Sequence, residues 1–376
     1  GASMLRRILL TATSYPRSAS DWQGLFIREM LGALARSKDT SVRYWGPPGP
    51  LPDHVDYAGS EADSRYMHRL AEHGGIAHLL RSNPLIGILR GVGLVRRMRR
   101  VIELNRDTTE ILHLNWLQSA LAIPGRGNRA LVTILGTDFK LLEIPGIASM
   151  LRRKFSANSV ILAPNAEWME DGLRQAFGEQ VKCVKCVPFG IDDPFYRVEH
   201  VSGQPVRRWI TVLRVTRAKL GPLLQWAEKV AGTRDEFHLF GPMQEEMTLP
   251  PWICYHGPVT PDTLIREWYP QATAMVTLSQ HDEGRPQVLL EAMAAGLPVV
   301  ASRIPAHVDL LKSAAGGLLV STEREFASAL QTVSDPHARA SLSSAARQSI
   351  KETYGTWDDC AGRYHALYNT LLRGNT

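Results

Sequence analysis

The chain has 376 residues, of which 44% are hydrophobic and 21% are charged, and its formal net charge is +6 at pH 7. This composition is typical of a globular protein and excludes disordered and collagen-like chains. The length suffices for two domains with cores of their own. No apolar run approaches the roughly 20 residues needed to cross a bilayer. Four scattered cysteines exclude a disulfide framework, and the Cys183–Cys186 pair lacks partners for a zinc site.

Strand-like and helix-like segments alternate along the whole chain, beginning with an apolar strand at 8–12. A long polar loop follows it, and a helix opens at Gly24. This alternation predicts an α/β fold with parallel sheets, because parallel neighbours need a crossover helix. Further strands of the first half are expected at 111–116, 131–138, 159–165 and 184–187.

Polar residues at the ends of these strands are candidates for lining a cleft. His113 lies in the strand 111–116, while Gly136 and Asp138 belong to a Gly-Thr-Asp turn that closes the strand 131–138. Each polar side chain also has a structural interpretation. A core histidine is at least as common, and Asp138 could cap the helix that follows it.

The positive charge belongs to the first half of the chain. Residues 1–190 hold 25 Lys and Arg against 17 Asp and Glu, whereas the remainder holds 18 against 20. Wound as a helix from Val92, the chain places Arg96, Arg97 and Arg100 opposite an apolar stripe. This pattern predicts a peripheral contact with an anionic membrane surface, although a solvated face over a core stripe explains it equally well. Nucleic acid is disfavoured, because no stacking aromatic residues are interleaved with the arginines.

The second half follows a predicted linker at 193–207 and opens with a strand at 209–213. Arg214 and Lys219 come next, on the strand-to-helix loop. A guanidinium and an ammonium that converge on a diphosphate would neutralise the charge of a departing group. Solvent-exposed cations without a ligand are the alternative interpretation.

The most informative segment follows the buried strand predicted at 274–278. Glu283 and Glu291 stand eight positions apart, with Gly284 allowing a sharp turn between them and Pro286 suiting the first position of a helix. The first amides of that helix have no intrahelical acceptor and form a seat for a phosphate. These amides belong to Gln287, Val288 and Leu289.

The two glutamates flank this seat. Glu283 stands in front of it, and Glu291 lies about one turn inside the helix. One carboxylate could bind sugar hydroxyls and the other a ribose diol. Taken singly, either glutamate could be an ordinary partner of the helix dipole. Together with the strand on each side, the segment is a much more specific signal of a binding site than either glutamate alone.

This segment resembles the Glu-x7-Glu signature of retaining glycosyltransferases of the GT-B fold, in the large group often called glycosyltransferase family 4. The Gly-Arg-Pro loop containing Arg285 is similar to the Gly-Met-Pro or Gly-Leu-Pro loops of bacterial members. The family also has an Arg and a Lys at the spacing of Arg214 and Lys219, although Leu213 replaces a usual glycine. The resemblance implies a catalytic set of Glu283, Arg214 and Lys219.

The resemblance also implies where the donor binds. Gly24 would let the backbone approach the donor phosphates, and Gly241 with Pro242 would mark a strand end where base and ribose pack. The implied donor-binding set is Gly24, Glu291, Gly284, Arg285, Gln287, Val288, Gly241 and Pro242. The cleft and acceptor candidates are Gly136, Asp138 and His113, while Leu135 stands where relatives often carry a sugar-contacting histidine.

The fold implied is GT-B, with two Rossmann-like domains that face each other across a cleft. Residues 4–192 would form the acceptor-side domain, and 208–355 the domain that binds the nucleotide sugar. Residues 356–376 would form a C-terminal helix that crosses back to the first domain.

The implied activity is transfer of a sugar from a nucleotide-sugar donor to a glycan or lipid-linked acceptor, as in bacterial surface polysaccharide assembly. No Asp-x-Asp metal motif stands out, so the transfer is expected to need no metal and no cofactor besides the donor, with UDP slightly ahead of GDP. A cytoplasmic protein, peripheral on the inner face of the membrane, is expected.

Two other functional classes fit the same resemblance. A sugar-nucleotide 2-epimerase or a phosphorylase-like enzyme of the same fold would convert or cleave its substrate without a second sugar acceptor. A non-catalytic scaffold would bind a nucleotide sugar or glycan only. The presence of both glutamates and both cations speaks against an inactive site.

Overall fold

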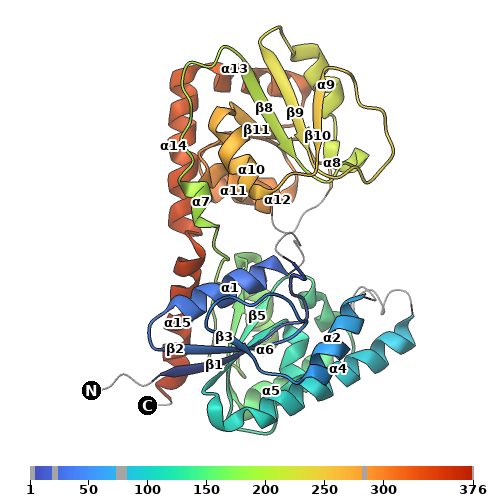
Figure 1. The fold of residues 1–376 in the computed structure, drawn as a ribbon, viewed down its shortest axis with the longest axis vertical. Helices are drawn as coiled ribbons and strands as arrows, with labels where there is room; N and C mark the ends of the chain where they lie inside the picture. The colour runs from blue at the N-terminus through green and yellow to red at the C-terminus, as the bar shows by residue number, and fades with distance from the viewer. Residues whose placement is uncertain (1–4, 19–23, 73–82, 282–285, 375–376) are drawn as a thin grey trace. The chain divides into compact units, whose positions relative to one another are not determined.

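The computed structural model describes residues 5–18, 24–72, 83–281 and 286–374. The chain divides into two compact units (Figure 1), the first comprising Gly1–Gly190 with Trp357–Thr376 and the second Ile191–Thr356. Each unit contains one sheet, and all strand pairs in both sheets are parallel. The predicted α/β fold with parallel sheets is therefore confirmed.

The first unit has a seven-stranded sheet in the order β3-β2-β1-β4-β5-β6-β7. Parallel sheets are covered on both faces, so their central strands are apolar throughout, as the buried run in β1 illustrates. The strands are β1 Arg6–Thr11, β2 Thr40–Trp45, β3 Val55–Tyr57, β4 Ile111–Asn115, β5 Arg129–Ile134, β6 Ser159–Pro164 and β7 Cys183–Val184.

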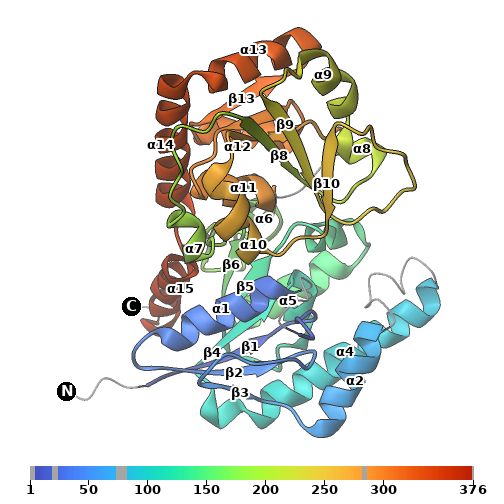
Figure 2. The same ribbon diagram turned by 45° about the horizontal axis from the view of Figure 1, so that its top comes forward.

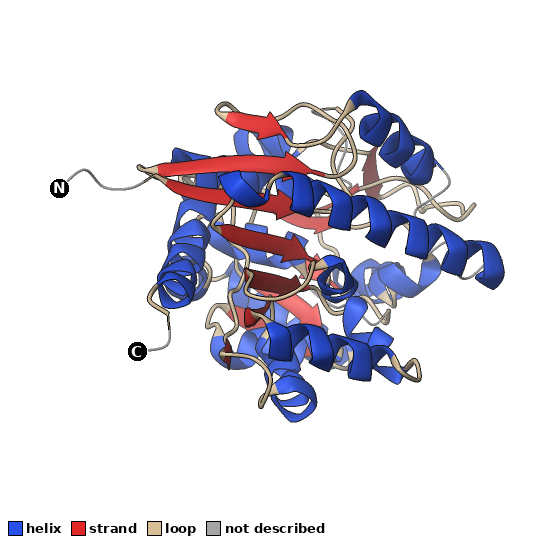
Figure 3. Ribbon diagram, turned by 90° about the horizontal axis from the view of Figure 1, so that it is seen from below, coloured by secondary structure: helices blue, strands red, loops and turns tan. Residues whose placement is uncertain are grey.

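Helices lie on both faces of this sheet (Figure 3). Ile8 and Leu10 face a core shared with α1 and α15, whereas Leu9 faces the core that includes residues of α2, α4, α5 and α6. The helices are α1 Leu25–Arg36, α2 Glu61–Glu72, α4 Pro84–Leu104, α5 Ile147–Ala157, α6 Glu170–Phe177 and α15 Trp357–Leu372. Short 3-10 segments are η1 Arg106–Thr108, η2 Leu117–Ala122, η3 Asp138–Glu143 and η4 Glu167–Met169.

The second unit has a six-stranded sheet in the order β10-β9-β8-β11-β12-β13. Its strands are β8 Arg207–Val212, β9 Asp235–Phe240, β10 Ile253–Gly257, β11 Ala274–Thr277, β12 Val299–Ser302 and β13 Gly317–Val320. Its helices (Figure 2) are α7 Asp193–Tyr196, α8 Arg217–Leu220, α9 Leu223–Val230, α10 Pro261–Thr263, α11 Gln287–Ala294, α12 Pro305–Ser313, α13 Glu323–Ser334 and α14 Pro336–Thr353. The segments η5 Leu264–Trp268 and η6 Tyr269–Gln271 precede β11.

The segment predicted as a linker at 193–207 is partly structured. It contains α7, whose Phe195 is 2% exposed and packs with Val198 into the core of the second unit. The Tyr196 hydroxyl donates to the Gly355 carbonyl at 2.7 Å, which fixes α7 to the end of α14. The linker prediction was therefore wrong for 193–198, because two large apolar side chains in that stretch have a core to enter.

None of the described helices is long and apolar enough to span a lipid bilayer.

Candidate functional site

Four predicted site residues lie where parallel strands of the second unit end. Arg214 follows β8, Gly241 and Pro242 follow β9, and the segment leading to Gln287 follows β11. Because β8 lies between β9 and β11 in the sheet, these three loops are neighbours at its carboxyl edge. Ligands of open α/β sheets bind at this edge.

Backbone hydrogen bonds join the β8 and β9 loops. The Leu213 amide donates to the Phe240 carbonyl at 3.0 Å, and the Val215 amide donates to the Pro242 carbonyl at 2.9 Å. Gly241 has a φ of 133°, and a Cβ at this position would stand 1.6 Å from the Leu213 carbonyl oxygen. Only glycine allows this approach, so Gly241 shapes the loop through its missing side chain.

The two predicted cations lie on the β8–α8 connection. Arg214 is exposed and Lys219 is half-buried. Thr216 caps α8, since its hydroxyl oxygen accepts a hydrogen bond from the Lys219 amide at 3.1 Å. The cap fixes the helical turn that bears the ammonium, as expected for Thr before a helix.

A second set of contacts ties α8 to the loop after β11. The Gln280 amide donates to the Ala218 carbonyl at 2.9 Å. Gly221 has a φ of 54°, and a Cβ there would lie 2.0 Å from the Leu278 carbonyl oxygen. The turn with Lys219 therefore packs directly against the backbone that leads from β11 toward α11. The predictions for Glu283, Gly284 and Arg285 concern positions outside the described residues.

The helix α11 begins at Gln287, one residue later than the sequence predicts, and Pro286 is its N-cap with φ −82° and ψ 69°. The Leu290 amide donates to the Pro286 carbonyl at 3.1 Å and makes the first helical bond. The amides of the three residues before it have no acceptor within the helix. The positive end of the helix dipole thus lies at the carboxyl edge of the sheet.

The predicted donor-binding side chains of α11 share one face. Gln287 is exposed, while Val288 and Glu291 are half-buried, in contrast to the buried Leu289 and Leu290. Positions i, i+1 and i+4 lie on one side of a helix. On this side Gln287 is exposed, whereas Val288 packs against the core of the unit.

Glu291 has an electrostatic neighbour in the core. Burial, and then the negative charge of Glu291, raise the pKa of the Tyr269 phenol above its usual range. Tyr269 is 1% exposed and belongs to the core of the second unit. The neutral phenol is therefore an electrostatic neighbour of the Glu291 carboxylate, and Glu291 itself is half-buried.

Additional bonds link the ends of β11 and β12, which sequence reasoning missed. The Ser302 hydroxyl donates to the Ser279 carbonyl at 2.5 Å, and His307 Nδ1 lies 2.9 Å from the Ser302 carbonyl oxygen. His307 is 1% exposed. The sequence Ser-Arg-Ile-Pro-Ala-His does not reveal the bond between Ser302 and Ser279, because these two residues follow or end different strands.

His113, a candidate cleft residue of the first unit, is a core residue. It is 0% exposed, and its ring lies 2.5 Å from the Tyr368 hydroxyl and 2.8 Å from the Thr133 hydroxyl. Burial lowers the pKa of the His113 imidazole to about 3. The cleft assignment was wrong, because α15 covers this face of β4 and its Tyr368 occupies the space beside the ring.

Asp138 is also structural. Its carboxylate accepts from the amides of Leu135 and Gly136, both at 2.9 Å, and from the Leu117 amide at 3.0 Å. Burial raises its pKa, while these N–H donors act in the opposite direction. At 4% exposure it neither lines an open surface nor caps the following segment, whose N-cap is Thr137. Both interpretations of Asp138 were wrong, since it instead stabilises the turn that precedes it.

Two other first-unit candidates have backbone conformations that favour glycine. Gly136 has a φ of 114° at the carboxyl end of β5. Gly24 has a φ of 67° and precedes α1, and a Cβ there would lie 2.6 Å from the Tyr15 amide nitrogen. At Gly24 the backbone approaches its neighbours more closely than any side chain would allow, as a glycine near a phosphate would require. At Gly136 the nearest atom to a Cβ would be in the Trp168 ring, at 3.5 Å.

Sequence reasoning missed two tryptophans at the carboxyl edge of the first sheet. Trp116 directly follows β4 with a φ of 90°, a conformation that is strained for a bulky residue. Trp168 follows β6, is 58% exposed, and its ring centroid is 5.7 Å from that of Phe139 in an edge-to-face contact. The available signal was simple: each tryptophan comes within a few residues of a strand end.

The described residues contain no group of three or more His, Cys, Asp or Glu that could hold a metal ion. Burial raises the pKa of the Cys186 thiol to about 12, which disfavours the thiolate that binds metals.

Known proteins match part of the chain by sequence. The family model described as "Glycosyl transferases group 1" matches residues 211–335, which include β9, β11 and α11. A curated relative, a probable sucrose-phosphate synthase of Thermosipho melanesiensis, is 37% identical over 87 residues, 23% of this chain and 20% of that protein. The chain thus matches about a fifth of the length of this relative.

Solved structures match nearly the whole chain. Sucrose-phosphate synthase from Thermosynechococcus elongatus has a TM-score of 0.66 at 17% identity, over 98% of this chain and 100% of that chain. HepE of Anabaena in complex with UDP-glucose has a TM-score of 0.58 at 13% identity, over 97% and 99% of the two chains. At such identities the likeness concerns the fold. The predicted resemblance to GT-B glycosyltransferases, with two Rossmann-like domains, is thereby confirmed.

Proposed function

We propose that this chain, which has the GT-B fold and a group 1 glycosyl transferase domain, is a retaining glycosyltransferase that moves a sugar from a nucleotide-sugar donor to a glycan or lipid-linked acceptor. The observation that carries the proposal is the hydrogen bond from the Gln280 amide to the Ala218 carbonyl. It attaches the turn bearing Lys219 to the loop that leads into α11. Two cations and a helix N-terminus thus share one edge of the second sheet.

This combination suits a diphosphate. The amides at the start of α11 can donate to phosphate oxygens, with the positive end of the helix dipole behind them. The Arg214 guanidinium can bind two phosphate oxygens at once, and the Lys219 ammonium adds a compact charge. All of these groups stabilise negative charge, which grows on the diphosphate as the sugar leaves it.

Retention at the anomeric carbon follows without a protein nucleophile. The bond from the anomeric carbon to the phosphate oxygen breaks, and the acceptor hydroxyl oxygen bonds to the same carbon on the same face. The acceptor proton passes to the departing phosphate oxygen. The protein contributes orientation and charge stabilisation, which together account for most of the rate in such reactions.

The two glutamates bind the parts of the donor on either side of the diphosphate. Glu291 binds the ribose diol, since its carboxylate is half-exposed on the same face of α11 as Gln287. Glu283 binds the sugar hydroxyls and is the counterpart of Glu291 on the loop before the helix. Gly241 and Pro242 bring the β9 loop to the same edge, where the base packs.

UDP is the preferred nucleotide of the donor. Support comes from the structural match to HepE of Anabaena, whose solved complex contains UDP-glucose. The donor is the only small molecule required, and Arg214 and Lys219 supply the positive field that a metal supplies elsewhere.

The acceptor binds at the carboxyl edge of the first sheet. Trp168 presents an exposed aromatic face there, and the apolar faces of sugar rings pack on such surfaces. The excess of basic residues in the first half of the chain suits an anionic or membrane-proximal acceptor. Assembly of a bacterial surface polysaccharide in the cytoplasm, on the inner face of the membrane, fits both features.

Nucleotide binding and nucleotide release test the proposal. We expect UDP to raise the thermal unfolding temperature more than GDP or ADP does, because bound ligand stabilises the native state. We then expect one UDP-sugar from a panel to release UDP when an acceptor glycan is added, with the anomeric configuration of the product, read by NMR, equal to that of the donor.

Three results would point elsewhere. Conversion of the donor without an acceptor would favour an epimerase or a phosphorylase-like enzyme. Binding of a nucleotide sugar without any turnover would favour a scaffold. The absence of a thermal shift with every nucleotide and nucleotide sugar would remove the proposed donor site.

A further inference from the structure

The first half of α4 has an apolar outer face. Leu85, Ile88, Leu89 and Val92 are 69%, 57%, 64% and 47% exposed. Their spacing of i, i+3, i+4 and i+7 places them along one stripe of the helix. Four large aliphatic side chains in a single exposed stripe are unusual for a surface that meets only water.

The opposite face of α4 explains why this stripe is left outside. Leu94, Met98, Val101 and Ile102 are buried in the core of the first unit, and all four belong to the second half of the helix. The first two turns contribute only Gly87 as a buried residue. The apolar side chains of the first half are therefore not needed for the packing of this unit.

The outer stripe becomes cationic farther along the same helix. Continuing the helical spacing from Val92 leads to Arg96, Arg99 and Arg100, all of them exposed. Arg99 pairs with Glu103 at 3.5 Å. Within the described ranges, no carboxylate lies at ion-pair distance from Arg96 or Arg100. One face of one helix thus changes from aliphatic to basic.

Arg97, which the sequence grouped with these arginines, has a different role. Its guanidinium lies 4.2 Å from the centroid of the Tyr66 ring and 3.2 Å from the Asp63 carboxylate, both on α2. It fastens α2 to α4. The exposed basic face of α4 therefore consists of Arg96, Arg99 and Arg100, whereas the sequence predicted Arg97 in place of Arg99.

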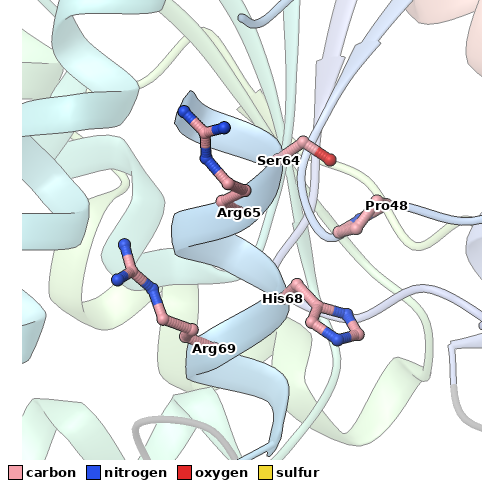
Figure 4. A pocket seen from close by; sticks show the side chains of 5 residues that line it. All are labelled: Pro48, Ser64, Arg65, His68 and Arg69. Carbon is pink, nitrogen blue, oxygen red and sulfur yellow. The ribbon is translucent and has the colours of Figure 1, made fainter. Parts of the chain in front are cut away.

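The neighbouring helix α2 also bears exposed cations. Figure 4 shows Arg65 and Arg69 extending from one side of α2, and Ser64 and His68 on the side toward Pro48. These residues line a hollow of about 320 Å³. The Tyr66 hydroxyl donates to the Arg90 carbonyl at 3.4 Å, so α2 lies beside the apolar half of α4.

We propose that the N-terminal half of α4 inserts into the interfacial layer of an anionic lipid bilayer. Leu85, Ile88, Leu89 and Val92 enter the acyl boundary, and Arg96 and Arg100 contact lipid phosphates at the level of the head groups. A helix with an apolar stripe and flanking cations lies in such an interface. The change from aliphatic to basic along one face matches the depth profile of a bilayer, from acyl chains to phosphates.

The positive charge of the exposed arginines favours a membrane over a second copy of the chain as the occupant of this face. Arg96 and Arg100 need an anionic surface that continues beyond the apolar patch, and anionic lipids supply one beside the acyl layer. This membrane contact goes beyond the proposed transfer reaction and is independent of it, because α4 lies outside the donor-binding edge.

Co-sedimentation of the full chain with lipid vesicles tests the inference. We expect binding to vesicles of mixed phosphatidylcholine and phosphatidylglycerol, much weaker binding to phosphatidylcholine alone, and weakening by salt. The double variant Leu85→Ser with Leu89→Ser should lower the partition coefficient on the order of a hundred-fold, because two aliphatic side chains no longer enter the acyl boundary. Arg96→Gln with Arg100→Gln should lower it roughly thirty-fold at low salt.

Matched controls exist on the same unit. Leu104→Ser changes a leucine that is 75% exposed at the other end of α4, and Arg153→Gln changes an exposed arginine of α5. Both should bind vesicles within twofold of the unsubstituted chain. All variants should keep its circular dichroism spectrum and its response to UDP.

Two outcomes overturn the inference. The first is a chain that stays in the supernatant with both vesicle compositions. The second is a chain that forms dimers by light scattering, with Leu85→Ser and Leu89→Ser dissociating the dimers but leaving vesicle binding unchanged. A failure of nucleotide turnover would leave the vesicle result untouched, so the two proposals are tested separately.

Discussion

The carboxyl edges of the two sheets differ in what lies at the strand ends. In the second unit, backbone bonds and two glycines bring the loops after β8, β9 and β11 together. Arg214 and Gln287 are exposed there, and Lys219 is half-buried. In the first unit, His113 lies within β4 and Asp138 follows β5, and both are buried and hydrogen-bonded. A polar residue at a strand end is therefore a site candidate only where the surrounding loops leave it open.

The largest expected effect is the loss of a cation at the second edge. Lys219→Ala or Arg214→Ala should lower turnover roughly 10²–10³ fold, the usual scale for a lost contact with transition-state charge. Steady-state release of nucleotide measures this. Arg217→Ala is the matched control, since Arg217 lies on α8 together with Lys219 and forms an ion pair with Glu245 at 3.2 Å. Equal losses in all three variants would mean a general disturbance of α8, and normal activity of both site variants would exclude the assignment.

The glycine contact at this edge gives the next largest effect. Gly241→Ala should destabilise the second unit by about 3 kcal/mol and abolish nucleotide binding, because its Cβ would collide with the Leu213 carbonyl. Gly257→Ala is the control: its φ of 75° is also positive, but no atom lies within 4 Å of its Cβ. It should cost about 1 kcal/mol. Chemical unfolding and a thermal shift with UDP would measure both, and equal costs would contradict the contact.

The buried histidine of the first unit predicts an acid sensitivity. Burial lowers the pKa of His113 to about 3 in the native protein, against 6.5 for an unperturbed histidine. Below pH 6.5 the unfolded chain binds a proton that the native chain does not, so the stability contributed by His113 is present above pH 6.5 and is lost as the pH falls toward 3. Between pH 6.5 and 5, the loss should be about 2 kcal/mol.

Hydrogen exchange of the β4 amides at pH 7 and pH 5 would measure this loss. His113→Gln should be less stable at pH 7, because the bonds to Thr133 and Tyr368 change, but its stability should depend less on pH. An unchanged pH dependence in this variant would show that other groups are responsible.

The smallest effect is expected at the first edge. Trp168→Ala should weaken use of the acceptor about tenfold, the scale of one lost aromatic stacking contact, with little effect on the thermal shift by UDP. Ile144→Ala, which removes another exposed apolar side chain of the same unit, is the control. A loss of UDP binding in Trp168→Ala would contradict a role limited to the acceptor.

Local pattern alone determined much of this protein. Short apolar strands and the helices between them are recognised from residues that are close in the chain. The sequence therefore predicted the parallel sheets, and it placed Arg214, Lys219 and the start of α11 to within one or two residues of the elements observed. The resemblance to GT-B glycosyltransferases rested on the same short segments.

Only the tertiary structure decided which side chains are buried. His113 became a core residue because Tyr368, from the far end of the chain, packs on its strand. The aliphatic stripe of α4 was hidden in the sequence, because α4 carries apolar residues on both faces. In the second half of α4, the apolar face is buried in the core of the first unit. In the first half of α4, the apolar residues on the opposite face are exposed. Burial depends on contacts between residues remote in sequence, and periodicity within one helix carries no record of them.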